Sequence, residues 1–314
     1  MRILLVLAAA MLAAAGAASA QVAAPLLNPM PVARLNAKPA IVATAQNPAL
    51  LSWDGPPRVA ASYSNVDFDD ASTATVNPDA TGKVTAVLVR LVGERFAFGA
   101  ESQKVRLDPV GAGSSIELGA QSAGASVQFG DWISVGIGRH VETYKEFGVD
   151  QRETLSLAGV GARFGGVYYV AAVRFNADVK DQIAPAETSR PGTAYGIAFH
   201  TRDQEHGVHL EAYHTERAEV VDPMLSVDEL KTNGYAAEVV WWNLLFGIVG
   251  HDSKRLTTTG NGSEARQAAV SVGYVPAQGL ALVATLSKQE FSDAATGAED
   301  ASVEIKSLGL SWMF

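Results

Sequence analysis

The 314-residue chain contains no cysteine. Disulfides therefore cannot hold it together, which excludes the small cross-linked scaffolds found among exported proteins. Beyond the first residues, the sequence also lacks any uninterrupted apolar stretch of the roughly 18 residues that a membrane-spanning helix needs. Charged side chains interrupt each apolar run at short intervals. The sequence therefore excludes a helical membrane bundle.

A clustered basic face is missing as well. The net charge of −9 argues against a nucleic-acid partner, which needs concentrated positive charge. Neither a G-x-S-x-G nor an H-E-x-x-H motif occurs, and we expect no enzyme activity. His200, His209 and Glu211 are suitable metal ligands by type, but no tight spacing joins them. We therefore expect neither a metal nor a cofactor.

The first 20 residues have the features of a secretory signal peptide. Basic Arg2 precedes an apolar run, and Ala18-Ser19-Ala20 forms a small-x-small cleavage site. A retained membrane anchor would need a longer apolar core. We expect cleavage before Gln21 and export through the inner membrane.

From residue 58 onward the sequence shows the period-two apolar pattern of β-strands, and no helical period of comparable length. High apolar content, 48%, combined with 29 scattered glycines also suits strands. About 14 strands are predicted, at 58–68, 83–93, 96–108, 115–129, 132–146, 151–165, 167–180, 192–202, 206–220, 233–242, 244–256, 265–276, 279–292 and 301–314.

The links between these strands alternate between tight turns and longer polar segments. Outer-membrane barrels have short periplasmic turns, longer external loops and an even number of strands. A soluble sandwich or barrel is the alternative, but it has no reason to alternate its links. We predict an all-β fold: a transmembrane antiparallel β-barrel over residues 58–314, located in the outer membrane.

Side-chain alternation agrees with an apolar outer face. Ile133, Val135 and Ile137 oppose small residues, and the chain ends on the alternating segment "SLGLSWMF" with Phe314 last. Aromatic residues gather near the tight turns, as expected for an interfacial girdle: Trp132, Phe164, Tyr168, Tyr169, Trp241, Trp242, Phe246, Trp312 and Phe314.

Residues 21–57 break the strand pattern because proline is concentrated there. Their apolar side chains still need burial, and a lumen about 14 strands wide can hold a plug. We therefore predict that residues 21–57 form an N-terminal hatch inside the barrel. The apolar hatch residues Leu50 and Leu51 would lie along the path of a substrate.

The stretch "NPALLSWDGPPRVAASYSNVDFDD" resembles the junction between hatch and first strand in the long-chain fatty-acid transporter family of Gram-negative outer membranes. Asn47, Pro48 and Ala49 match that family's Asn-Pro-Ala motif. The resemblance implies a 14-stranded barrel, an opening in the wall for apolar cargo, and a C-terminal aromatic, Phe314, that the barrel-assembly machinery reads. The chain lacks the family's Gly-rich stretch before the motif and has shorter external loops.

The predicted lumen lining is polar, and charges are tolerable on a wet interior face. Hairpin register predicts that Arg90 lies opposite Glu101 and that His200 lies opposite His209. These residues hold the wall together or line a path. The full predicted set is Arg90, Glu101, Gln103, Glu117, Gln121, His140, Glu142, Arg163, Arg174, His200, His209, Glu211, Glu238 and Gln267.

Glycines predicted to face the lumen, Gly136 and Gly138 among them, leave room for a conduit or for the hatch. Glycine can also mark a kink in a strand. Gly99, beside Ala100, is therefore the candidate for the wall opening that the resemblance implies.

These features predict a channel for passive uptake of small hydrophobic compounds, fatty acids or hydrocarbons, with membrane lipid as its surroundings and a small hydrophobic ligand as its cargo. A general diffusion porin for small polar solutes is the first alternative. A structural or adhesive barrel is the second. The place of residues 21–57 discriminates between a plugged and an open pore.

Overall fold

The computed structural model describes residues 47–53, 57–70, 80–109, 116–146, 149–181, 188–203, 205–222, 226–256, 263–276, 278–293 and 299–314. The predicted signal peptide, residues 1–20, and residues 21–46 of the predicted hatch lie outside this set. Among the described residues, no helix has the length and apolarity to cross a membrane.

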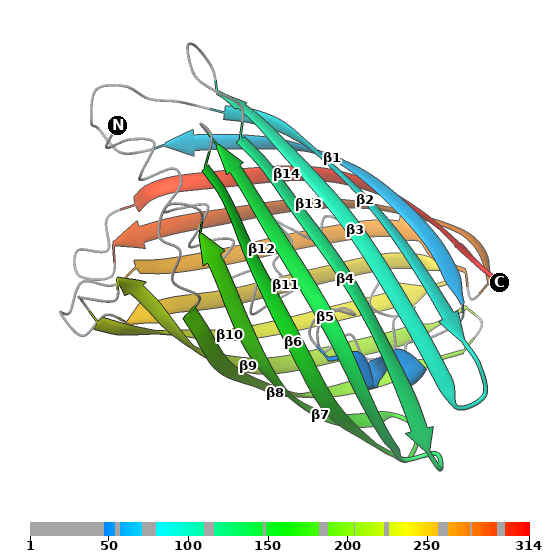
Figure 1. Cartoon of the computed structure of the whole chain (residues 1–314). Helices are drawn as coiled ribbons and strands as arrows, with labels where there is room; N and C mark the ends of the chain where they lie inside the picture. The colour runs from blue at the N-terminus through cyan, green and yellow to red at the C-terminus, as the bar shows by residue number, and fades with distance from the viewer. Residues whose placement is uncertain are drawn as a thin grey trace.

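The strands form one closed antiparallel barrel in which each strand pairs with its sequence neighbours (Figure 1). The predicted fold class and strand number are therefore confirmed. The strands are β1 Arg58–Asp70, β2 Ala80–Val92, β3 Phe96–Pro109, β4 Ile116–Phe129, β5 Ile133–Glu146, β6 Val149–Phe164, β7 Tyr168–Asp181, β8 Thr188–Arg202, β9 Gly207–Asp222, β10 Ser226–Trp241, β11 Leu244–Leu256, β12 Ser263–Tyr274, β13 Gly279–Asp293 and β14 Glu299–Met313.

The barrel closes where the first strand meets the last. Arg58 of β1 lies opposite Met313 of β14, and the Phe314 backbone N–H donates to the Pro57 carbonyl at 3.1 Å. Further along the same strand pair, away from Arg58, the Ser64 hydroxyl donates to the Ser307 hydroxyl at 2.8 Å. Closure leaves no edge strand, because β1 pairs with β14 as well as with β2.

The outer face carries the large apolar side chains. On β14, Leu308, Leu310 and Trp312 are exposed while Ser307 and Met313 are buried. Exposed apolar residues recur on all strands, well beyond the patches that a soluble protein tolerates. The outer face is therefore the face that meets hydrocarbon, as the alternation predicts.

At one end of the barrel, tight turns join consecutive strands. We call this end the tight-turn end, and it also carries Pro57 and Phe314. Between β10 and β11 only Trp242 and Asn243 turn the chain, with φ of 49° and 64°. Two consecutive positive φ values are typical of a type I′ hairpin turn. The links at the other end were all predicted to be longer, but the link between β5 and β6 is short, because β5 ends at Glu146 and β6 begins at Val149.

Candidate functional site

A short 3-10 helix, η2 (Pro48–Trp53), lies against the inner face of the barrel near the tight-turn end (Figure 1). Pro48, Ala49, Leu50, Leu51 and Trp53 are all buried. The helix contacts β3, β4, β5 and β6. The predicted hatch residues Asn47–Leu51 thus lie together on the inner wall.

Asn47 begins this helix and attaches it to the wall. Its Oδ1 accepts the Ala49 backbone N–H at 3.1 Å, and the Leu50 N–H donates to the Asn47 carbonyl at 3.1 Å. Asparagine is a favoured residue just before a helix, and proline is favoured at the first helical position. The Asn47 Nδ2 donates to the Ala172 carbonyl of β7 at 3.2 Å. The Asn-Pro-Ala sequence therefore explains both the start and the anchoring of η2.

The inner wall beneath η2 lacks side chains because glycines face it. A Cβ added at Gly136 would overlap the Ala49 nitrogen and the Pro48 carbonyl carbon. At Gly161 it would lie 2.9 Å from the Trp53 ring and 3.0 Å from Leu50. Such close backbone approach is possible only beside glycine. We call this surface the glycine seat: Gly124, Gly136, Gly138, Gly159 and Gly161.

Two inward-facing serines complete the seat. The Ser52 hydroxyl lies 2.8 Å from both the Ser126 and Ser134 hydroxyls, and Ser134 donates to the Ala49 carbonyl at 2.6 Å. Each hydrogen bond of this kind contributes about 0.5–1.5 kcal/mol. Hydrogen bonds to the serines of β4 and β5 thus hold one side of η2, and its apolar side chains lie on the other side.

That apolar side packs on aromatic residues of β7 and β9. Trp53 lies 6.0 Å from the Tyr169 ring, and the Arg163 guanidinium lies 5.6 Å from the centre of the Trp53 ring. Both are favourable aromatic geometries. Buried apolar residues complete the cluster: Leu50, Trp53, Tyr169, Ala171, Ala198 and Tyr213.

A second apolar cluster continues from the first along the same inner wall, away from the tight-turn end. It comprises Leu155, Leu157, Val173, Phe175 and Ala194. Leu157 lies opposite Phe175, and Val173 lies opposite Ala194, so the cluster crosses β6, β7 and β8. From Tyr169 to Phe175 the wall extends about 20 Å along the strand. We call the inward-facing apolar residues of β6–β8 the luminal stripe.

A third apolar cluster lies on the inner wall at β10–β14 near the tight-turn end: Val240, Leu245, Val275, Ala281, Val283 and Met313. The rest of the inner wall is largely polar. Buried inward-facing residues there include Arg90, Glu101, Gln103, His140, Gln267, Ser287 and Gln289. The Gln267 amide donates to Ser287 at 2.9 Å, and Ser122 lies 2.9 Å from His140 Nδ1. The lumen therefore has apolar clusters at β6–β8 and, near the tight-turn end, at β10–β14, and its other buried inward-facing residues are largely polar.

A second polar group lies on β8–β10. His200 faces His209 across the strand pair, as predicted, with ring centroids 5.7 Å apart. His209 Nε2 lies 3.0 Å from the Glu211 carboxylate, and both side chains are fully buried. Glu238 lies opposite His209 in the register. Among the residues that the structure describes, no group of three or more His, Cys, Asp or Glu could hold a metal ion.

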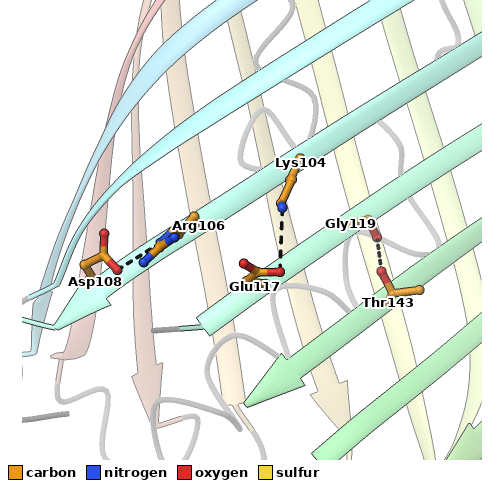
Figure 2. A network of polar contacts seen from close by, with 6 residues as sticks. All are labelled: Lys104, Arg106, Asp108, Glu117, Gly119 and Thr143. Atoms are coloured by element: carbon orange, nitrogen blue, oxygen red, sulfur yellow. Dashed lines mark hydrogen bonds and ion pairs between the residues drawn. The ribbon is translucent and has the colours of Figure 1, made fainter. Parts of the chain in front are cut away.

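Three predicted lumen residues point the wrong way: Glu117, Gln121 and Arg174 face outward. Glu117 instead pairs with outward-facing Lys104 at 3.7 Å (Figure 2). On β7 both faces are apolar, with Tyr168 and Val170 outside, so the periodicity does not fix the orientation. On β4 both faces are small and polar, which leaves the same ambiguity. The side chain of Glu142 lies outside the described residues.

One predicted register is also wrong. Arg90 lies opposite Gly99, and Glu101 lies opposite Leu88. The turn is tighter than expected, because the Gly93 N–H already bonds the Phe96 carbonyl at 2.7 Å. β3 pairs through Gly99 and Ala100 on both sides without a register shift. A kink at this position stays a prediction.

Sequence reasoning placed Gly136 and Gly138 toward the lumen but missed Gly159, Gly161 and the serines of the seat. The available signal was the repeated Gly-x-Gly spacing in neighbouring strands, at 136–138 and 159–161. Two glycines on one strand face indicate close backbone approach.

Neither a protein-family model nor a curated protein matches the chain. Among solved structures, a FadL homologue from Pseudomonas aeruginosa is similar, with a TM-score of 0.53 at 10% identity over 87% of this chain and 94% of that chain. The CymD monoaromatic hydrocarbon channel gives 0.54 at 13%, over 87% and 93%. The Pseudomonas putida toluene transporter TodX gives 0.51 at 9%, over 87% and 93%. This likeness shows that the chain shares the fold of these proteins.

Proposed function

We propose that the protein is an outer-membrane channel for passive uptake of small hydrophobic compounds, fatty acids or hydrocarbons. The luminal stripe carries this proposal. A pore for polar solutes gains nothing from burying Leu155, Leu157, Val173 and Phe175 along one inner wall. A hydrophobic compound gains about 2.5 kcal/mol for each 100 Å² of apolar surface it buries there.

The hatch gives the channel its resting state. Leu50 and Trp53 cover the stripe at the tight-turn end. The stripe residues beyond them are also buried, Leu155 to 1% and Phe175 to 3% exposure. Cargo therefore needs the covering segment to yield, and we propose that residues 21–57 are that segment.

Structural similarity supports the cargo class. CymD is described as a monoaromatic hydrocarbon channel and TodX as a toluene transporter, and both resemble this chain over most of their length. We extend that class, small apolar molecules, to this barrel.

A general diffusion porin for small polar solutes is the second candidate. The polar side of the lumen favours it, with Arg90, Glu101, Gln103 and Gln289 all facing inward. A porin would use the polar side of the lumen and would leave the luminal stripe idle.

Uptake into proteoliposomes distinguishes the two candidates. The test compares toluene with a polar solute of similar size, in wild type and in Val173→Glu. We expect Val173→Glu to lower toluene uptake about tenfold, because the charge opposes entry of apolar cargo. Val173→Thr keeps the side-chain shape and should give a smaller loss. Gln289→Glu on the polar side is the matched control and should leave toluene uptake unchanged.

Equal toluene uptake by Val173→Glu and the control would refute the role of the luminal stripe, provided that circular dichroism shows the same strand content. Planar-bilayer conductance before and after deletion of residues 21–57 tests the hatch. A large and unchanged conductance in both proteins would favour the porin.

A further inference from the structure

Most outward-facing cations of the barrel lie beside an acidic residue. Figure 2 shows Lys104 next to Glu117 and Arg106 next to Asp108 near the ends of β3 and β4. The same arrangement recurs around the wall in the pairs Lys231–Glu216, Lys254–Glu264, Arg266–Asp252, Lys288–Glu290 and Lys306–Glu304. These pairs neutralise the charges near the boundary of the apolar band.

Lys83 and Arg152 depart from this arrangement within the described part of the chain, and so do Arg139 and Arg174. Arg139 and Arg174 are both exposed on the outer face, and neither forms an ion pair with any residue in the described part of the chain. The nearest outward acid on β7, Asp178, lies four residues beyond Arg174 and accepts a hydrogen bond from Asn176 at 3.1 Å. Two unpaired guanidinium groups thus face the membrane.

The register places the two arginines on either side of β6. Arg139 lies opposite Ser156, and Arg174 lies opposite Ala158. Two strand spacings and a two-residue offset separate their Cα atoms by about 12 Å. Both side chains can therefore reach one lipid head group.

The two arginines lie closer to the tight-turn end than most of the paired cations do, although Lys306 lies only seven residues from Met313. Arg139 lies six residues after Ile133, and Arg174 lies six residues after Tyr168, each counted from the tight-turn end. For strands tilted about 40°, six residues correspond to about 15 Å of an apolar band about 25 Å thick. Lys254 and Lys288 lie further along, at ten residues after Leu244 and nine after Gly279.

An unpaired arginine on the lipid face is unfavourable at this depth and becomes tolerable where it meets an anion. The outward residues directly opposite the arginines are small or polar: Ala123 and Ser156 flank Arg139, and Ala158 and Thr193 flank Arg174. Arg152, also exposed, lies beyond them on β6. The sector β4–β8 therefore carries three exposed arginines, Arg139, Arg152 and Arg174, that form no ion pair with a described residue; Lys83 of β2 is another such cation outside this sector.

We propose that Arg139 and Arg174 bind the phosphates of an outer-leaflet lipid whose head group carries two phosphate groups, of the lipid A type. Guanidinium groups bind phosphate through two parallel hydrogen bonds, which lysine cannot make. Tight turns mark the periplasmic side of such barrels, so the arginines reach the outer leaflet. Binding at this sector is independent of what passes through the lumen.

The test uses the full-length protein in mixed detergent micelles, titrated with fluorescent bis-phosphorylated lipid A and with the same lipid after removal of both phosphates. We expect Arg139→Gln and Arg174→Gln each to weaken binding of the phosphorylated lipid about tenfold, and the double variant more. Arg139→Lys keeps the charge and should lose part of the affinity. Lys306→Gln, whose cation is paired with Glu304, is the control and should change binding by less than about twofold.

Three outcomes overturn the proposal. Equal binding of the dephosphorylated lipid, or equal losses in the control, shows that phosphate is not recognised. Competition by inorganic phosphate at the same concentration as lipid A identifies a free anion as the ligand. Conversion of a dimer to a monomer in the double variant, without change in lipid affinity, identifies a second copy of the chain as the occupant of this sector.

Discussion

Gly136→Val should displace η2 from the wall, since a Cβ at this position overlaps the backbone of Pro48 and Ala49. Gly138 faces the same seat two residues further along, but its Cβ would lie 3.2 Å from the Ala123 carbonyl oxygen and 3.4 Å from the Pro48 side chain. Gly138→Ala therefore needs only a small adjustment. The two variants therefore differ in how severely the new side chain overlaps η2, although both lie on the same face of β5.

The magnitude follows from what η2 loses. Releasing it exposes Leu50, Leu51 and Trp53, at about 1.5–3 kcal/mol each, and breaks the serine and Asn47 hydrogen bonds at about 1 kcal/mol each. Release also restores the conformational freedom of about seven residues, which is worth about 1–2 kcal/mol for each. This regained entropy offsets most of the cost of releasing η2. The seat is therefore marginal, and an overpacking cost of about 1–3 kcal/mol shifts it toward the released state.

The absence of cysteine gives a direct assay. Leu51→Cys, at a position 1% exposed, introduces one thiol whose maleimide labelling rate reports release of η2. We expect Gly136→Val to raise that rate about 10–100-fold and Gly138→Ala to leave it within about threefold. Equal rates in the two variants, with equal strand content, would refute the close contact at Gly136.

Three further predictions concern the start of η2, the turn after β8 and the C-terminal residue. Asn47→Ala should raise the same labelling rate about fivefold, because a lost helix-capping residue costs about 1 kcal/mol; an unchanged rate would show that Asn47 does not hold η2. The backbone N–H groups of His206 and Glu205 donate to Asp203 and hold the pKa of its carboxyl below the usual range. The stabilisation of this turn is therefore present above the unfolded pKa and lost as pH falls through the folded pKa, so amide exchange at 203–206 should rise in acid and lose this dependence in Asp203→Asn. Phe314→Ala should reduce the amount of assembled barrel in the outer membrane, measured by fractionation, more than Leu310→Ala does; equal yields would remove any special role of the terminal aromatic.

The sequence predicted most of the barrel because lipid on one side and a closed lumen on the other impose a two-residue period. That period is clear on β14, where Leu308, Leu310 and Trp312 alternate with Ser307 and Met313. It fails where both faces have the same character. On β7 the inner face carries the luminal stripe, so Arg174 was assigned to the wrong side.

The site was harder to predict than the wall. The Asn-Pro-Ala sequence located the hatch only through its resemblance to a family motif. The helix η2 was not predicted, although Asn47 and Pro48 both favour the start of a helix. The glycine seat depends on contacts between residues far apart in the sequence, such as Asn47 with Ala172 of β7. Only the register of β4, β5 and β6 brings Gly124, Gly136 and Gly161 together, and the sequence fixes a register only where turn lengths are certain.

Photolabelling tests the central claim most directly. A small aromatic diazirine would be bound to the reconstituted barrel, activated by light and located by peptide mass spectrometry. The account predicts labels on the inner residues of β6–β8, at Leu157, Val173, Phe175 and Ala194, and weaker labelling in Val173→Glu. Labels concentrated on the polar side, at Gln267 and Gln289, or spread evenly around the lumen would contradict it.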